Sequence, residues 1–105
     1  MTLAVDERTL GWDVVALHRL WEESSVPVRK LLKHLHCYPD REETMMSVAE
    51  YVQCSDRSLR KLVDQLEEHC VRRYGRPLPF ARRDLNGYEM YCMPGPVTRM
   101  VFQAY

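Results

Sequence analysis

The sequence predicts an α+β fold, in which several helices are followed by one β-hairpin and a last short helix. Apolar residues recur at helical spacing through most of the first 74 residues, which indicates amphipathic helices. Asn86-Gly87 then lies inside residues 79–94, which we interpret as two strands. Asn-Gly is the strongest short-range signal for a type I′ hairpin, because both residues tolerate a positive φ angle. The 105 residues of the chain are enough for one small domain, so we predict a single domain over 1–105.

Two helices are expected in the first 40 residues. Ser25 can cap the second of them, over 26–37, and Pro27 is tolerated in its first turn. Pro39-Asp40 ends this helix, and residues 40–44 are predicted to form a polar connector. The first helix, over 9–24, is predicted from apolar residues at steps of three and four: Leu10, Val14, Leu17, Leu20 and Trp21.

Residues 46–74 are predicted to form two helices joined by a tight turn. Ser47-Val48-Ala49-Glu50 has the pattern of a capping box, which opens the shorter helix. Gln53-Cys54 forms the turn, and Ser55 caps a long helix that ends at Gly75-Arg76-Pro77. After the hairpin, a last helix is predicted over 96–105. The long helix is supported by an apolar stripe with a period of 3.6 residues: Leu59, Leu62, Val63, Leu66 and Cys70.

The charge is balanced overall but unevenly distributed. The 15 Lys and Arg equal the 15 Asp and Glu, which lowers the expectation of non-specific binding to nucleic acid. Residues 1–50 hold 6 basic and 9 acidic residues, whereas residues 51–105 hold 9 and 6. The basic half contains the long helix and the hairpin, so the asymmetry has the sign that a duplex-facing surface needs. The chain has no apolar run of membrane-spanning length and no signal-peptide pattern near Met1, so we predict a cytoplasmic protein.

The order helix, tight turn, helix and hairpin resembles the winged-helix superfamily over residues 28–93. The residues that carry the resemblance are Leu31-Leu32-Leu35, Ser47-Val48-Ala49-Glu50-Tyr51-Val52, Ser55-Asp56-Arg57-Ser58-Leu59 and Asn86-Gly87. Residues 75–80 and 91–93 also resemble a poorly characterised group of small actinobacterial winged-helix proteins. The resemblance implies a winged helix-turn-helix with a two-stranded C-terminal wing and additional N- and C-terminal helices.

In that superfamily, the helix after the turn enters the major groove and the wing touches the flanking backbone or minor groove. The resemblance therefore implies that the chain binds double-stranded DNA as a small transcriptional regulator. Because consecutive strand residues point to opposite faces, at most one of the two wing arginines can face DNA if the hairpin lies flat. The implied DNA-binding residues are Arg57, Ser58, Arg60 and Lys61 at the front of the long helix, Arg72 and Arg73 at its far end, and Arg82 and Arg83 on the wing.

Other features favour a winged-helix protein-interaction module without DNA binding. Asp64, Glu67 and Glu68 lie on the same long helix and would be repelled by phosphate if they faced a duplex. The Asn86-Gly87 tip also lacks a basic cluster, and Met, Tyr and Trp side chains could form a protein-binding surface instead. The apolar residues of the terminal helices could either close the core or pair two copies as a homodimer.

Neither catalysis nor metal binding has a recognisable motif. A Cys–His pair is conceivable, but no oxyanion hole, phosphate loop or paired carboxylates accompany it. A zinc site would have to join His34, His36 and Cys37 with His69 and Cys70 from another helix, which is unlike the short spacings of structural zinc sites. We predict no enzyme activity, no metal and no cofactor. We also expect small buried thiols rather than disulfides at the four cysteines, Cys37, Cys54, Cys70 and Cys92.

Overall fold

The computed structural model describes residues 9–103, with side chains as far as Met100. Over this range the chain forms an α+β fold with helices around one antiparallel sheet, as the sequence predicts. The order of elements is α1 (Val14–Glu23), α2 (Val26–Cys37), β1 (Glu43–Thr44), α3 (Met45–Val52), α4 (Asp56–Tyr74), β2 (Ala81–Leu85), β3 (Tyr88–Cys92) and α5 (Gly95–Gln103).

The start of α1 lies five residues after the predicted one. Leu10 and Gly11 have φ angles of 55° and 81°, and a right-handed helix cannot run through such residues. Asp13 is the N-cap, because its carboxylate accepts a hydrogen bond of 2.8 Å from the backbone N–H of Ala16. The next helix, α2, has the predicted bounds.

The N-cap of α3 differs from the predicted residue, whereas the N-cap of α4 is the predicted one. Thr44, not Ser47, is the N-cap of α3, and its hydroxyl accepts from the N–H of Ser47 at 3.1 Å. The predicted capping box is therefore wrong, since Ser47 lies inside the helix. Ser55 caps α4 as predicted, accepting from the N–H of Ser58 at 3.1 Å. Between the two helices, Gln53 adopts a left-handed conformation that ends α3.

The sheet has three strands where the sequence predicted two. The third strand, β1, lies in the predicted polar connector and pairs antiparallel with β3, so the strand order is β1-β3-β2. A strand of two residues is too short to show the alternation by which strands are recognised in sequences. The predicted hairpin is confirmed, and Asn86 and Gly87 have the positive φ angles of 54° and 85° that its turn requires.

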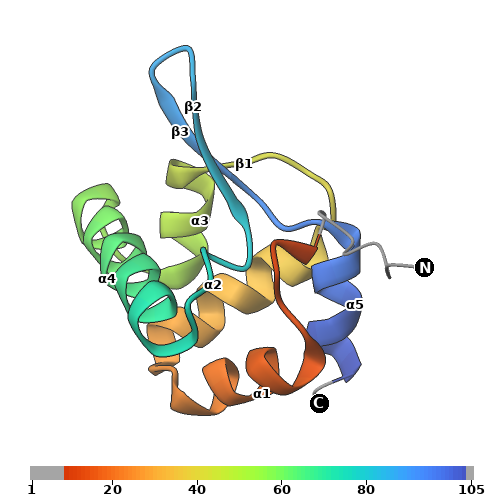
Figure 1. The fold of residues 1–105 in the computed structure, drawn as a ribbon. Coiled ribbons are helices and arrows are strands. Elements are labelled where there is room, and N and C mark those ends of the chain that lie inside the picture. The colour runs from red at the N-terminus through yellow and green to blue at the C-terminus, as the bar shows by residue number, and fades with distance from the viewer. Residues whose placement is uncertain (1–8, 104–105) are drawn as a thin grey trace.

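The helices form one body, and the β2–β3 hairpin projects from it (Figure 1). The N-terminal end of α4 lies on the same side of the body as the hairpin (Figure 1). Below them, α5 packs against α1 and α2. This packing leaves the hairpin tip and the first turns of α4 open to solvent. The fully buried core residues from the helices and the sheet include Leu31, Leu35, Val48, Leu59, Val63, Tyr91 and Val97.

The terminal helices close the core of a single chain. Ala16, Leu17 and Leu20 of α1 are buried in the same cluster as Val97 of α5. The side chains of Val101, Phe102 and Tyr105, which are apolar residues of the predicted last helix, lie outside the described residues. Among helices within residues 9–103, none is long and apolar enough to cross a membrane.

All four cysteines are free thiols. Cys70 is buried, as predicted, whereas Cys37 is exposed near the end of α2, and burial was the wrong expectation there. Cys54 and Cys92 are half-buried.

Candidate functional site

A groove lies between the front of α4, the corner where β1 meets α3, and the tip of the β2–β3 hairpin. One part of it has a volume of about 190 Å³ and includes Met46, Arg60 and Tyr88 in its lining. An adjoining hollow of about 390 Å³ is lined by Met45, Asp56, Arg57 and Arg60. Met45, Asp56 and Arg60 line both hollows, so the two hollows adjoin beside the first turns of α4.

The front of α4 presents exposed cations. Arg57 and Lys61 are exposed, and neither forms an ion pair with any other residue in the described range 9–100. Arg60 is also exposed and lies at the limit of an ion pair, with its Nε 4.0 Å from Oε2 of Glu89. Ser58 is exposed, but its hydroxyl accepts a hydrogen bond from Ser55 at 3.0 Å. Three of the four predicted contacts at the front of this helix therefore offer positive charge to solvent, at the end where the helix dipole is also positive.

The rear of α4 carries arginines that have partners within the chain. Arg72 pairs with Glu68 one turn earlier on the same helix. The guanidinium of Arg73 lies 3.4 Å from Glu23 on α1 and 5.5 Å from the centre of the Tyr74 ring. The 15 residues from position 57 to position 72 correspond to about 22 Å of helix at 1.5 Å per residue. The structure therefore separates the predicted contacts at Arg72 and Arg73 from those at the front.

Glu23 is the centre of the contacts between α1 and the rear of α4. It accepts a hydrogen bond of 2.9 Å from the hydroxyl of Tyr74, and His69 Nε2 lies 3.5 Å from its other oxygen. The hydrogen bond from Tyr74 and the charge of Arg73 hold the pKa of Glu23 below its ordinary value. These contacts serve packing between helices and leave the rear cations locally neutralised.

Arg82 lies between the hairpin and α4 and is only 19% exposed. Its guanidinium contacts three carboxylates: Asp64 at 2.7 Å, Glu89 at 2.8 Å and Glu67 at 3.5 Å. Burial alone would lower the pKa of Arg82, but its hydrogen bonds to Glu89 and Asp64 outweigh that effect and raise the pKa further above its ordinary value. All these partners are protein carboxylates on α4 and β3, so the guanidinium is directed toward these two elements.

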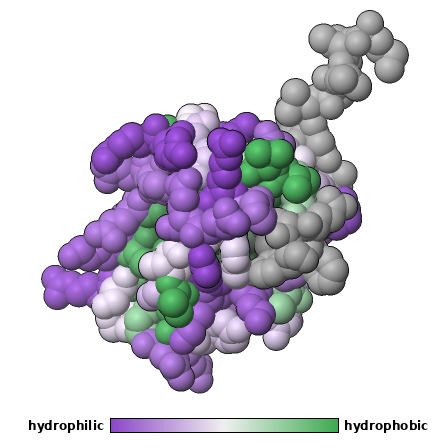
Figure 2. All heavy atoms as spheres, turned by 90° about the horizontal axis from the view of Figure 1, so that it is seen from below, coloured by the Kyte–Doolittle hydropathy of each residue, from purple (hydrophilic) through white to green (hydrophobic). Residues whose placement is uncertain are grey.

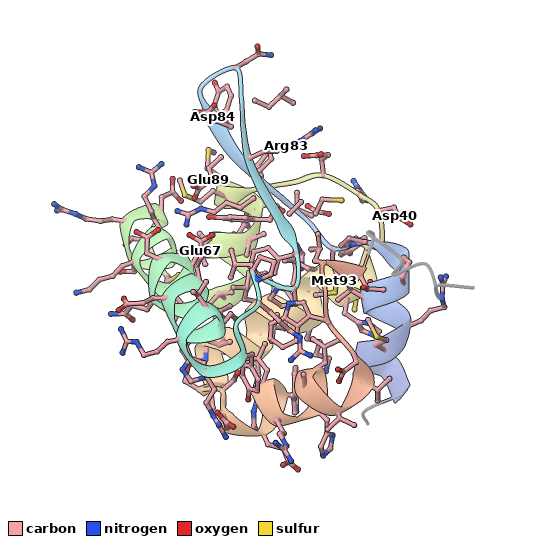
Figure 3. The ribbon with its side chains drawn as sticks, in the orientation of Figure 1. Asp40, Glu67, Arg83, Asp84, Glu89 and Met93 are labelled. Atoms are coloured by element: carbon pink, nitrogen blue, oxygen red, sulfur yellow. The ribbon has the colours of Figure 1, made fainter. Side chains whose placement is uncertain are left out.

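Arg83 points to the opposite side of the hairpin. It is exposed, and its Nη2 lies 2.6 Å from Oε1 of Glu42 in the segment before β1. Figure 3 shows Glu67 and Glu89 on the side of the hairpin that faces α4, with Arg83 on the other side. The alternation of strand faces predicted this separation, but the sequence did not show that both hairpin arginines have carboxylate partners.

The acidic residues of α4 are used in the same ion pairs. Asp64 and Glu67 contact Arg82, and Glu68 pairs with Arg72. Glu68 is neutralised by its own partner, whereas Asp64 and Glu67 share the single positive charge of Arg82 with Glu89, so the repulsion from phosphate that the sequence suggested is reduced only in part.

Apolar side chains near the groove were not among the predicted site residues. Met46 is 60% exposed, Tyr88 is 63% exposed, and both line the groove. Leu85 is 45% exposed and pairs with Tyr88 across the strands beside the turn. The signal for Leu85 and Tyr88 was present, because they flank Asn86-Gly87, where a hairpin tip leaves few neighbours to cover them.

The residues considered for a zinc site do not form one cluster in the described structure. His34 packs between Tyr38 and Tyr51, with ring centres 5.2 and 4.6 Å away. Burial raises the pKa of the Cys70 thiol to about 12, so this sulfur is held in its neutral form. Within the described part of the chain, no group of three or more His, Cys, Asp or Glu residues is placed to hold a metal ion.

In comparisons with known proteins, no family model, no curated protein and no solved structure matches this chain. The two hollows and the exposed cations at the front of α4 form the candidate site.

Proposed function

We propose that this chain is a winged helix-turn-helix domain that binds double-stranded DNA as a small transcriptional regulator. The order α2-β1-α3-α4-β2-β3, with β1 paired to β3, supports this proposal. Residues 53–55 join α3 to α4, a length typical of a helix-turn-helix. On this proposal, α4 is the recognition helix and the β2–β3 hairpin is the wing.

The observation that carries the proposal is the pair of exposed, unpaired cations at the front of α4. In the range of side chains that the structure describes, Arg57 and Lys61 have no acidic partner, while the acidic residues farther along the helix have basic ones. A free guanidinium can bind guanine through O6 and N7 or bind phosphate with two hydrogen bonds. A free lysine contributes a point charge to a phosphate.

The zero net charge of the chain is compatible with this function, because binding depends on the local field. Asp56 also lies in the first turn of α4, where a carboxylate is stabilised by the helix dipole. In the proposed complex, the first two turns of α4 enter the major groove and the wing tip lies on the flanking backbone. A protein bound in this way would regulate transcription by occupying its site.

The test is fluorescence anisotropy with a labelled random-sequence duplex at several salt concentrations. Binding by the wild type should weaken steeply as salt rises, because each neutralised phosphate adds about −0.9 to the slope of log K against log salt. Arg57→Ala/Lys61→Ala should weaken binding and make the slope shallower by about 1.8, if each side chain neutralises one phosphate.

Arg72→Ala/Arg73→Ala is the matched control, because it removes the same charge from the other end of the same helix. The control should leave the salt slope unchanged. Absence of duplex binding by the folded wild type at low salt would overturn the proposal.

A protein-interaction module is the second candidate, and the exposed apolar side chains near the groove favour it. Met46 and Tyr88 line the groove, and Leu85 lies beside Tyr88 on the wing. A partner bound through such residues would show little dependence on salt. If the chain binds a protein partner, and if this binding does not change with salt and is lost in Tyr88→Ala, the result would favour this function over DNA binding.

A homodimer formed through the terminal helices remains part of the proposal. Val14 and Val15 are exposed on α1. Seen from below, the surface is mostly hydrophilic and carries a few hydrophobic patches (Figure 2). Sedimentation velocity should show a dimer of the wild type and a monomer of Val15→Glu. A wild type that sediments as a monomer at high concentration would contradict the dimer.

A further inference from the structure

We infer that Arg82 is a positioning residue that fixes the wing against the recognition helix, rather than a residue that contacts DNA. The position of the hairpin is inferred from the contacts of Arg82, and the expected effect on DNA binding rests on the proposed function. Two of the three carboxylates around Arg82, Asp64 and Glu67, belong to α4, and the third, Glu89, belongs to β3. One guanidinium therefore joins three secondary-structure elements.

These contacts account for the ion pairing between the wing and the helix. In the part of the chain with described side chains, each ion pair that joins α4 to the hairpin involves Arg82 or Glu89. The hairpin projects from the body (Figure 1), and its base is held there by the pairing of β3 with β1 and by the buried side chains of Phe80 and Tyr91. The ion pairs of Arg82 add a direct connection between the hairpin and α4 to this packing at the base.

Glu89 connects this cluster to the front of α4. Its Oε1 accepts a hydrogen bond from Arg82, and its Oε2 accepts one from the hydroxyl of Tyr91 and lies 4.0 Å from Nε of Arg60. Burial and the hydrogen bond to Glu89 raise the pKa of Tyr91, so its hydroxyl remains a donor at neutral pH. Glu89 thus holds Arg82 on one side and limits the position of a proposed DNA-binding arginine on the other.

The chemistry of the cluster requires arginine. A planar guanidinium has five N–H donors in a fixed fork and can reach three carboxylates in different directions. The ammonium group of lysine is compact and cannot span the same three partners, although it keeps the positive charge. Arg82→Lys therefore separates the geometry of the cluster from its charge.

The first experiment does not use DNA. Residual dipolar couplings of backbone amides would give the orientation of residues 81–92 relative to α4 in the wild type, in Arg82→Lys and in Glu89→Gln. We expect the couplings within the helices to stay the same and those of the hairpin to change or average toward zero. Hairpin couplings unchanged in both folded variants would overturn the inference, whether or not the protein binds DNA.

The second experiment measures duplex binding as a function of salt. Arg82→Lys should weaken binding about tenfold, the size of one lost charge-assisted contact, with the salt slope of the wild type retained. Arg83→Lys makes the same change on the opposite face of the same strand and should stay within about twofold of the wild type. If Arg82 contacts phosphate instead, Arg82→Lys will keep most of the affinity, and Arg82→Gln will make the slope shallower by about one.

Glu89→Gln should change duplex affinity in opposite directions, depending on whether Glu89 repels the duplex or positions the arginines. If Glu89 only repels the duplex, removing its charge will tighten binding. If Glu89 positions Arg82 and Arg60, the same change will weaken binding, despite the gain of one positive charge. Tighter binding would therefore contradict the inference. A wild type that does not bind DNA at all would reject the proposed function, while the dipolar couplings would still decide whether Arg82 fixes the hairpin.

Discussion

The two ends of α4 carry similar numbers of basic residues and have opposite surroundings. At the rear, Arg72 and Arg73 pair with Glu68 and Glu23. At the front, Arg57 and Lys61 have no acidic partner among the described side chains. The comparison teaches that a count of basic residues does not identify a nucleic-acid surface. What matters is which of the charges are already neutralised within the fold.

The rear of α4 is held by packing, because Trp12 in the segment before α1 contacts Pro77 and Tyr74. Trp12 is 3% exposed, its Nε1 donates to the carbonyl of Pro77 at 2.8 Å, and its ring lies 5.4 Å from that of Tyr74. Trp12→Ala should lower the free energy of unfolding by about 3–5 kcal/mol, as measured by urea denaturation. Trp12→Phe should cost less, because it keeps most of the buried area. A loss below about 1 kcal/mol in Trp12→Ala would show that the rear is not held in this way.

Burial at the rear also predicts how stability depends on pH. The pKa of Cys70 is raised from 9.0 to about 12, so the unfolded chain releases this proton at a lower pH than the folded one. The stabilising effect is complete below pH 9.0 and is lost as the pH rises toward about 12. The raised pKa values of Tyr74 and Tyr91 act in the same direction.

Urea denaturation on either side of this range should show the alkaline loss, and the loss should be smaller in Cys70→Ala. An alkaline loss of the same size in the variant would contradict the role of this thiol.

The front of α4 is stabilised by a local cap in addition to the burial of Leu59. Ser55→Ala removes the hydroxyl that accepts from the N–H of Ser58 and should cost about 1 kcal/mol of stability. Ser47→Ala is the control, because that hydroxyl lies inside α3 and only reaches Glu43 at 3.4 Å. A larger cost for Ser47→Ala than for Ser55→Ala in chemical denaturation would reverse this assignment of caps.

The smallest effect is expected for the exposed pair at the rear. Arg72→Ala removes an ion pair between residues four apart on a helix surface, which contributes about 0.3–0.5 kcal/mol. Duplex affinity should change by less than about twofold, because the partner Glu68 already neutralises this arginine. An anisotropy titration that shows a loss as large as that of Arg57→Ala would remove the distinction between the two ends.

Most elements of the fold could be predicted from local patterns. The apolar stripe of α4, its Ser55 cap and the Asn86-Gly87 turn depend on neighbours in the sequence, and the structure has each of them. The start of α1 could not be predicted in this way, because the positive φ angle of Leu10 depends on packing rather than on its residue type. The strand β1 was missed because its two residues show no period of their own and are defined by pairing with β3.

The candidate site was predicted less completely, because ion pairs depend on tertiary contacts. The sequence placed Arg57, Ser58, Arg60 and Lys61 on one exposed stretch of helix, and the structure has them there. It did not show that Arg82 turns inward, since Asp64 and Glu67 meet the hairpin only after folding. The pattern contained one hint, because Arg82 shares a strand face with Phe80, which is buried.

The most direct test of the central claim compares how salt affects duplex binding when charge is removed from each end of α4. The wild type, Arg57→Ala/Lys61→Ala and Arg72→Ala/Arg73→Ala would be titrated with the same labelled duplex over a series of salt concentrations. We predict a slope shallower by about 1.8 for the front variant and the wild-type slope for the rear variant. Equal slopes for the two variants, or no binding by the folded wild type at low salt, would contradict the claim that the front of α4 is the DNA-binding surface.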